Sequence, residues 1–429
     1  MHNSSMINLP DKVTQRAQKS FHLARSAFRV GSNVFGGRIE EARLPADYSP
    51  QPTDDFVAAA YFSAEVDSAY QLEQWVWPFE QLAQQLRDAG YSHQPFGIIV
   101  RSAHVAKHLR SRTTLPVRFS RLTKGLDAFM SAPSLRVVFY VNQSTGNFQA
   151  LRFPKPAHVH LSHGESEKIS MISNQLKAYD YVFTAGRAAQ NRIEQTLFGL
   201  DEDRMIDVGR PQLDRPREVP QVWRDFDSDA PAGKTVFYAP TWEGDSPAMA
   251  YGTLADNGRT LVTTMLDAGY RVIFRPHPRT GILKSAFERE LDAVQDIIRD
   301  HPRGFLDQTP DVTWQFEAAD LALAEMSSVA FDWLATRQPL VMIAPHNPAA
   351  EVLAGGLLDR CPLLEPGAEA GIAELLRTAD TADREVELKQ MSFDYLGATE
   401  WGTQLSRFVG AAESVIGSRE AAMRSRRSA

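Results

Sequence analysis

The sequence predicts an α/β protein with two domains of similar size, each built around a parallel β-sheet. Three observations support this fold class. The chain has 429 residues, which is enough for two domain-sized cores. Short apolar runs alternate with helical stretches along most of the chain, as buried parallel strands and their connecting helices do. After Asp214 this alternation stops and then resumes, which indicates a domain boundary.

The composition excludes several classes of protein. Hydrophobic residues make up 43% of the chain and charged residues 23%, as in ordinary globular proteins. The formal net charge of −7 gives no support to nucleic-acid binding. The single cysteine, Cys361, excludes a disulfide framework and favours a reducing compartment. No apolar run has the length of a membrane span, and the N-terminus lacks the apolar core of a signal peptide. We therefore expect a soluble, cytoplasmic protein.

Both ends of the chain are basic. Residues 11–40 hold six basic and two acidic residues with interleaved phenylalanines, and residues 418–429 read SREAAMRSRRSA. Such segments can lie on an anionic membrane surface. A solvated helix and a frayed tail explain each end alone at least as well. A peripheral contact with the inner face of the membrane is therefore an expectation that the sequence leaves open.

Seven apolar runs predict the strands of the first domain, which we place at residues 51–214. They lie at residues 55–62, 95–100, 115–120, 135–141, 157–163, 179–186 and 205–209. Between the first two runs, apolar residues recur at helical spacing from Trp75 to Leu86. Pro78 suits the first turn of that helix, and Gly90 suits its C-terminal stop.

The second domain is predicted at residues 235–400, after a linker at residues 215–234. This linker is rich in proline, aspartate and arginine and has no sustained period. Residues 1–50 form a separate basic segment, and residues 401–429 are expected to form a C-terminal helix and tail. The second domain is expected to hold strands at 235–240, 270–275, 320–324 and 339–345. One helix is expected to end at Ala268, and two more are expected at residues 283–300 and 329–336.

The carboxyl ends of the strands are where parallel α/β sheets bind ligands. In the first domain, His163 and Gly164 follow a strand and are surrounded by small and polar residues. Glycine permits a tight turn or the close approach of a ligand. A lone histidine is more often structural than catalytic, but these surroundings favour a functional site.

Two strand ends of the second domain also carry candidate side chains. Thr241 and Trp242 end the stretch YAPTW; a tryptophan there is more often a core plug under a loop, and stacking on a base or sugar is the alternative. In RPHPRTG, two prolines hold His277 on a rigid, non-helical turn. Arg275 and Arg279 flank it and suit a phosphate, although solvated arginines on a surface turn are the simpler explanation.

A further strand end carries Ser327 and Ser328, just before a helix. Serine is a favoured N-cap, so capping alone explains one of them. The free backbone N–H groups of a helix N-terminus also bind anions, and two hydroxyls add donors. We find no metal-ligand spacing, no phosphate-binding P-loop and no dinucleotide glycine motif, so we expect no bound metal or cofactor. The sequence thus predicts two histidines, one in each domain, facing a phosphate pocket across a cleft.

The order of these motifs resembles the CDP-glycerol glycerophosphotransferase family. The resemblance rests on HG, GRPQLD, FYAPTW, RPHP and ADLALAEMSSVAFDWLATRQPLV, between about Val159 and Val341. It implies a GT-B architecture of two facing, doubly wound Rossmann-like domains, and an enzyme of teichoic-acid-like or capsular polymer synthesis. The implied donor is CDP-glycerol or a related CDP-polyol, and the acceptor is lipid-linked or an oligosaccharide.

The resemblance also implies roles for individual residues. His163, with Gly164, would be the general base, and His277 would contact the donor diphosphate. The residues implied for donor phosphate are Arg275, Ser327, Ser328 and Asp332; those for the nucleotide end are Thr241, Trp242 and Glu325; and those elsewhere in the cleft are Arg210 and Asp214. Two departures stand out: the first histidine lies in LSHGESEK, and Glu325 replaces the family's aspartate. These departures leave the transferred group and the acceptor open.

The implied reaction is an attack by an acceptor hydroxyl on the β-phosphorus of the donor, with release of CMP. Two alternatives remain at this stage. One is a nucleotide-sugar glycosyltransferase on the same architecture. The other is a non-catalytic GT-B-like module that binds a polymer or a partner, against which the presence of both His163 and His277 argues.

Overall fold

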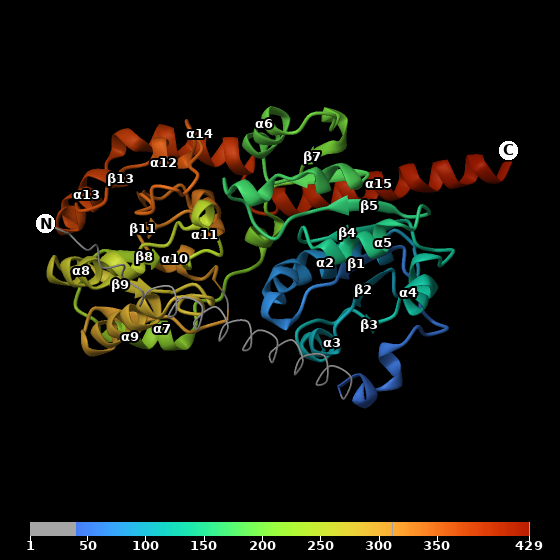
Figure 1. The fold of residues 1–429 in the computed structure, drawn as a ribbon, viewed down its shortest axis with the longest axis horizontal. Helices are drawn as coiled ribbons and strands as arrows, with labels where there is room; N and C mark the ends of the chain where they lie inside the picture. The colour runs from blue at the N-terminus through green and yellow to red at the C-terminus, as the bar shows by residue number, and fades with distance from the viewer. Residues whose placement is uncertain (1–39, 311, 429) are drawn as a thin grey trace, which may run out of the picture.

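The computed structural model describes residues 40–310 and 312–428 as two α/β domains (Figure 1). Most of the basic N-terminal segment expected at residues 1–50 lies outside the described residues, and so does its expected membrane contact. Within the described residues, no helix combines the length and apolar character needed to cross a membrane.

The first domain is built on a seven-stranded parallel sheet with the strand order β3-β2-β1-β4-β5-β6-β7. Each of the seven predicted apolar runs forms one of its strands. Their bounds are β1 Ala58–Phe62, β2 Phe96–Val100, β3 Val117–Phe119, β4 Val137–Tyr140, β5 Ala157–His160, β6 Tyr181–Thr184 and β7 Met205–Asp207. The central strands are buried along their whole length, which explains why they appear as continuous apolar runs in the sequence.

The second domain is built on a six-stranded parallel sheet with the order β10-β9-β8-β11-β12-β13. Its strands are β8 Thr235–Ala239, β9 Arg271–Phe274, β10 Gly304–Leu306, β11 Leu321–Ala324, β12 Leu340–Ile343 and β13 Leu363–Leu364. Four of them were predicted. The two edge strands, β10 and β13, were missed because they are very short and give no apolar run.

Helices cover the sheets in both domains (Figure 1). Their bounds are α2 Tyr70–Asp88, α3 Ala103–Leu109, α4 Thr123–Met130, α5 Phe148–Leu151, α6 Arg187–Thr196, α7 Gln221–Asp229, α8 Leu254–Asp267, α9 Ser285–Asp300, α10 Gln315–Ala318, α11 Ser328–Trp333, α12 Leu357–Arg360, α13 Ile372–Ala379, α14 Glu385–Leu396 and α15 Thr403–Ser428. Helix α11 is short and continues as a 3₁₀ turn, Leu334–Thr336.

Two local expectations were wrong. Helix α2 begins at Tyr70, so Pro78 lies in its interior and not in its first turn. The expected linker at 215–234 contains helix α7, whose Trp223 is buried against Trp314 in the core of the second domain. Only Trp223 and Phe226 anchor this nine-residue helix, and two apolar positions are too few to show a period in the sequence.

Helix α15 returns from the second domain to the first, where it lies along the sheet (Figure 1). Phe408 is fully buried there and packs against Trp75 and Phe79 of α2 and Phe139 of β4. The last helix of the chain therefore completes the core of the first domain, and it joins the two domains a second time.

We expect Phe408→Ala to lower the free energy of unfolding of the first domain by about 3–5 kcal/mol, because a large buried ring is replaced by a cavity. Chemical unfolding followed by tryptophan fluorescence measures this. Phe198→Ala is the matched control, since that ring is 89% exposed. Equal effects of the two substitutions would show that α15 does not belong to the core of the first domain.

Candidate active site

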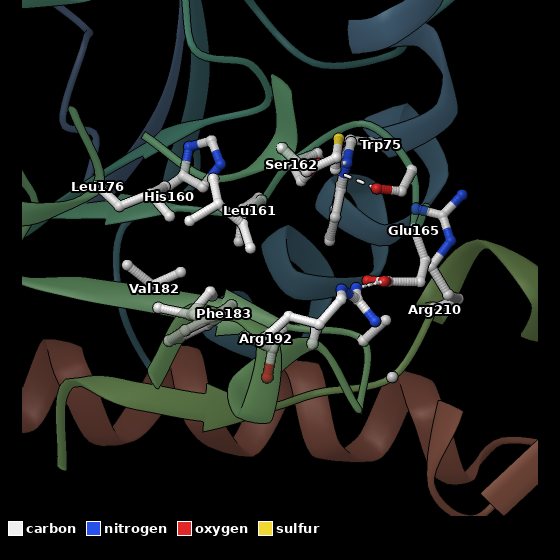
Figure 2. A pocket seen from close by; sticks show the side chains of 18 residues that line it. Trp75, His160, Leu161, Ser162, Glu165, Leu176, Val182, Phe183, Arg192 and Arg210 are labelled. Carbon is white, nitrogen blue, oxygen red and sulfur yellow. Dashed lines mark hydrogen bonds and ion pairs between the residues drawn. The ribbon is translucent and has the colours of Figure 1, made fainter. Parts of the chain in front are cut away.

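The loop after β5 presents His163 at the carboxyl end of the first sheet. Ser162, just before it, has a φ of 62°, which is uncommon for a residue other than glycine. The indole Nε1 of Trp75 donates a hydrogen bond of 2.7 Å to the Ser162 carbonyl (Figure 2). The Ser162 hydroxyl donates to the Gly164 carbonyl at 3.0 Å. These contacts hold the loop in a strained turn, as is common at functional sites.

Gly164 brings this loop into contact with the second domain. A Cβ atom at this position would lie 2.6 Å from the Cβ of Ser328. No side chain larger than hydrogen fits there without a shift of the loop or of α11. The predicted close approach at Gly164 is therefore an approach to the first residue of α11.

His163 and His277 come from different domains, and both rings contact Tyr70. The ring centroid of Tyr70 is 6.3 Å from that of His163 and 6.4 Å from that of His277, both in edge-on contact. Tyr70 is the first residue of α2. The structure therefore brings the two predicted histidines together around Tyr70, which the sequence analysis missed.

The loop after β9 holds His277 in one orientation. The backbone N–H of Arg279 donates to His277 Nδ1 at 3.1 Å, so the proton of the neutral ring is on Nε2. Trp242 stacks on His277 with a centroid distance of 6.3 Å, and the Arg279 guanidinium lies 3.7 Å from the Trp242 centroid. Trp242 is therefore a loop aromatic beside the candidate site and not the core plug that is more common.

A buried glutamate holds the backbone of the loop after β9. Glu243 is 1% exposed and accepts hydrogen bonds from the backbone N–H groups of Gly281, Leu283 and Lys284. A carboxylate that accepts three backbone hydrogen bonds holds the loop in place. Nothing in the sequence signals this role, because Glu243 follows the APTW motif as an ordinary polar residue.

Both histidines are neutral at physiological pH. Burial lowers the pKa of His163 to about 4, with help from Arg210 and Lys168. Burial lowers the pKa of His277 to about 3, with help from Lys168 and Arg279. The positive groups around the rings repel a further proton. A neutral His163 can accept a proton, and a negatively charged ligand between the domains would raise both pKa values.

Three buried hydroxyls at the carboxyl ends of neighbouring strands have no hydrogen-bond partner within the described residues. They are Thr241 Oγ1 after β8, Thr280 Oγ1 after β9 and Ser327 Oγ after β11, each at most 8% exposed. Ser327 occupies the N-cap position of α11, but its side chain makes no capping hydrogen bond. Capping therefore does not account for Ser327, and buried hydroxyls of this kind need a ligand or water.

A buried salt bridge links the two domains beside this site. The guanidinium of Arg210 donates to both oxygens of Asp332 on α11, at 2.7 Å from Nε and 3.0 Å from Nη2. Its Nη1 also donates to the His163 carbonyl at 3.4 Å. Both carboxylate oxygens of Asp332 are thus in use, so Asp332 positions Arg210 and α11. The expected contact of Asp332 with donor phosphate stays a prediction.

Three other residues that were expected to contact a ligand make contacts within the protein. Glu325 is fully buried and accepts from the backbone N–H groups of Thr241 and Thr253, and burial raises its pKa to about 7. Arg275 is bonded to Asp307 at 2.7 Å and to the Thr309 carbonyl. Asp214 accepts from the backbone N–H of Leu405 in the first turn of α15. Each of the three bonds a loop or a helix of the protein, and its expected part in the ligand site stays a prediction.

Two residues of the GESEK stretch cross to the second domain, which the sequence analysis missed. Glu167 accepts from the Tyr395 hydroxyl at 2.5 Å and from the backbone N–H of Leu357 at 3.0 Å. The Lys168 ammonium lies 5.4 Å from the centroid of the Tyr251 ring. The only sequence signal was the clustering of charge after His163.

A cavity of about 50 Å³ lies behind the His163 loop, inside the first domain (Figure 2). His160 Nδ1 and Arg192 Nη1 line it, and within the described residues neither has a hydrogen-bond partner. Arg192 is paired with the buried Glu165. The volume fits a few water molecules, since one water needs about 10–15 Å³. No group of three or more metal-ligating side chains occurs in residues 40–310 and 312–428.

Residues 157–348 match the model of the CDP-glycerol:poly(glycerophosphate) glycerophosphotransferase family. The match covers less than half of the chain. It confirms the resemblance that the order of motifs predicted, and it supports a transferase. No curated protein sequence matches the chain significantly.

Solved structures confirm the GT-B architecture. The wall teichoic acid polymerase TagF is 14% identical, with 95% of this chain and 99% of that chain covered and a TM-score of 0.55. A TagF variant soaked with CDPG has the same coverage, 15% identity and a TM-score of 0.54. A UDP-N-acetylglucosamine 2-epimerase described as putative, from Listeria monocytogenes, is 13% identical, with 84% and 96% covered and a TM-score of 0.56. At these identities the similarity concerns the fold.

We expect Arg210→Ala and Asp332→Ala each to lower the free energy of unfolding by about 3–5 kcal/mol, because each leaves one buried charge unpaired. The double variant Arg210→Met, Asp332→Leu should be more stable than either single variant, since it removes both charges. Thermal and chemical unfolding measure this. Additive effects in the double variant would show that the two residues are not coupled.

Proposed function

We propose that the chain is a glycerophosphotransferase. It moves glycerol phosphate, or a related polyol phosphate, from a CDP-linked donor to an acceptor hydroxyl and releases CMP. The polymer made in this way is teichoic-acid-like or capsular. The observation that carries the proposal is the set of three unpartnered buried hydroxyls at the strand ends of the second domain, opposite the loop of His163. Hydroxyl donors in that arrangement suit the oxygens of a diphosphate.

His163 acts as the general base in this proposal. A ring nitrogen of His163 is hydrogen-bonded to the Val141 carbonyl, which leaves the other nitrogen free to accept a proton. The acceptor oxygen forms a bond to the β-phosphorus of the donor, and its proton passes to His163. The bond from that phosphorus to the CMP oxygen breaks, and the electron pair leaves with CMP. The diphosphate of the bound donor raises the pKa of His163 and makes it a stronger base.

The second domain positions the donor. His277 carries its proton on Nε2, so the ring can donate a hydrogen bond from that nitrogen. Ser327 and Ser328 lie at the start of α11 and offer their hydroxyls as donors. Thr241 and Trp242 lie in the loop after β8. Phosphoryl transfer depends mainly on such fixed donors and on positioning. Arg279, stacked on Trp242, adds a positive charge to this side of the cleft.

Donor profiling tests the proposed function directly. The full-length protein is incubated with a panel of CDP-polyols and, in parallel, UDP-sugars, and the products are identified by mass spectrometry. CMP release from a CDP-polyol with growth of an acceptor supports the proposal. UDP release with transfer of a sugar would instead show a nucleotide-sugar glycosyltransferase, and no turnover with any donor would favour a binding module.

We expect His163→Ala to reduce kcat by about 10²–10⁴-fold, as the loss of a general base does, with little change in donor affinity. Initial rates of CMP release and calorimetric titration with CDP-glycerol measure the two quantities. His93→Ala is the control, because His93 is an exposed histidine of the same domain. Transfer by His163→Ala at the wild-type rate would rule out His163 as the base.

We expect the double variant Ser327→Ala, Ser328→Ala to fold and to bind the donor at least ~10-fold more weakly, because hydrogen bonds to charged groups contribute about 1.5–3 kcal/mol each. The Ser327 side chain does not cap α11, so little stability is lost. Circular dichroism checks the fold, and calorimetry with CDP-glycerol or CMP measures the affinity. Ser228→Ala is the control on an exposed serine. Wild-type affinity in a folded double variant would place the phosphate pocket elsewhere.

A further inference from the structure

Lys168 is the basic residue of the GESEK stretch, and its ammonium contacts the second domain. It belongs to the loop after β5, and its ammonium lies over the ring of Tyr251, with Nζ 5.4 Å from the centroid. Within the described part of the chain, no carboxylate lies within ion-pair distance of Nζ. The loop before Lys168 is held at Ser162 by Trp75 and at Glu167 by Leu357, so the lysine extends to the second domain from a fixed support.

The electrostatic surroundings of Lys168 are those of the candidate site. Burial lowers the pKa of Lys168 to about 8, while Glu325 and Asp245 act in the opposite direction. Lys168 in turn lowers the pKa of both His163 and His277. The ammonium is therefore close enough to both histidines to repel protons from them. A partly buried ammonium without a carboxylate partner is costly unless an anion joins it.

We infer that the Lys168 ammonium binds the diphosphate of the nucleotide-linked donor from the first domain, opposite the free hydroxyls of the second. The inference rests on the proposed function and identifies a cation for that same site. Arg275, the cation expected from the sequence, is bonded to Asp307, and Arg210 is bonded to Asp332. Lys168 has no such carboxylate partner among the described residues, so its charge remains available for the donor.

The position of Lys168 also fits the chemistry of the transfer. Negative charge builds up on the oxygens of the CMP leaving group as the phosphorus–oxygen bond breaks. A fixed ammonium beside those oxygens stabilises that charge without reorganisation. Since Lys168 belongs to the first domain and the hydroxyls to the second, the diphosphate meets donors from both sides only when the domains are in the arrangement seen here. Lys168 thus contributes both to donor affinity and to the transfer rate.

The test compares Lys168→Gln and Lys168→Arg with the wild type and with Lys124→Gln, a control on an exposed lysine of α4. Calorimetry gives the dissociation constants of CDP-glycerol and of inorganic pyrophosphate. We expect Lys168→Gln to weaken both by at least ~10-fold, Lys168→Arg to restore most of the affinity, and Lys124→Gln to change nothing, because a charged hydrogen bond to phosphate is lost only in the first case. Circular dichroism and the unfolding midpoint check that each variant is folded.

A pH series separates binding from support of the loop. From about pH 7 to about pH 9.5, wild-type affinity for pyrophosphate should fall as the ammonium loses its proton, whereas Lys168→Arg should show no such fall, since arginine stays charged. The other charged groups near Lys168 are His163, His277, Glu325 and Asp245. The two histidines, with pKa values of about 4 and about 3, are neutral throughout this range. Glu325, with a pKa of about 7, ionises at the start of the range in the wild type and in Lys168→Arg alike, so the difference between the two proteins reports the lysine.

The outcomes separate this inference from the proposed function. If Lys168→Gln binds both compounds as the wild type does, or if the wild type binds neither, the inference is wrong. If the wild type binds pyrophosphate through Lys168 but releases no CMP from CDP-glycerol, the proposed donor is wrong and the diphosphate contact stands. Loss of pyrophosphate affinity in both Lys168 variants alike would assign the lysine to loop structure and overturn the inference.

Discussion

The geometry of the cleft depends on the salt bridge between Arg210 and Asp332. It is buried, it joins the two domains, and its guanidinium also contacts the carbonyl of His163. The backbone N–H of Arg210 donates to Gln404 in α15 at 2.8 Å. One residue thus contacts the loop of His163, the helix that begins at Ser328 and the helix that returns to the first domain. Because both charged groups are desolvated, the pair adds little net stability, but removing either partner alone would leave a buried charge unpaired.

Buried glutamates near this salt bridge accept hydrogen bonds from the backbone of neighbouring segments. Glu243, Glu325 and Glu167 each accept at least one backbone N–H from a neighbouring loop. Their carboxylates are bonded within the protein, and Lys168 and Arg279 have no ion pair among the described residues. The proposed anionic donor is compatible with a net charge of −7, because local charge and not the overall balance decides binding at close range.

The sequence predicted the architecture well because parallel sheets leave a strong pattern. Strands buried on both faces appear as continuous apolar runs, and polar residues at their carboxyl ends mark the site. This rule led to His163, His277, Ser327 and Trp242. Tyr70 was missed, because Pro78 was expected in the first turn of the helix, and no sequence rule shows which end of a helix meets a distant loop. Glu325 was assigned to the donor by the family resemblance, since position along the chain does not reveal whether a carboxylate turns toward a ligand or toward backbone N–H groups.

The departure of GESEK from the usual family motif can be explained by the direction of alternate side chains. Glu165 pairs with Arg192 and Glu167 contacts Tyr395 and Leu357, so both acids are occupied by the protein. Lys168 points instead to Tyr251. The two additional negative charges of this stretch are thus used in contacts within the protein, and Lys168 has no carboxylate within ion-pair distance among the described residues. The altered motif changes how this loop contacts the second domain.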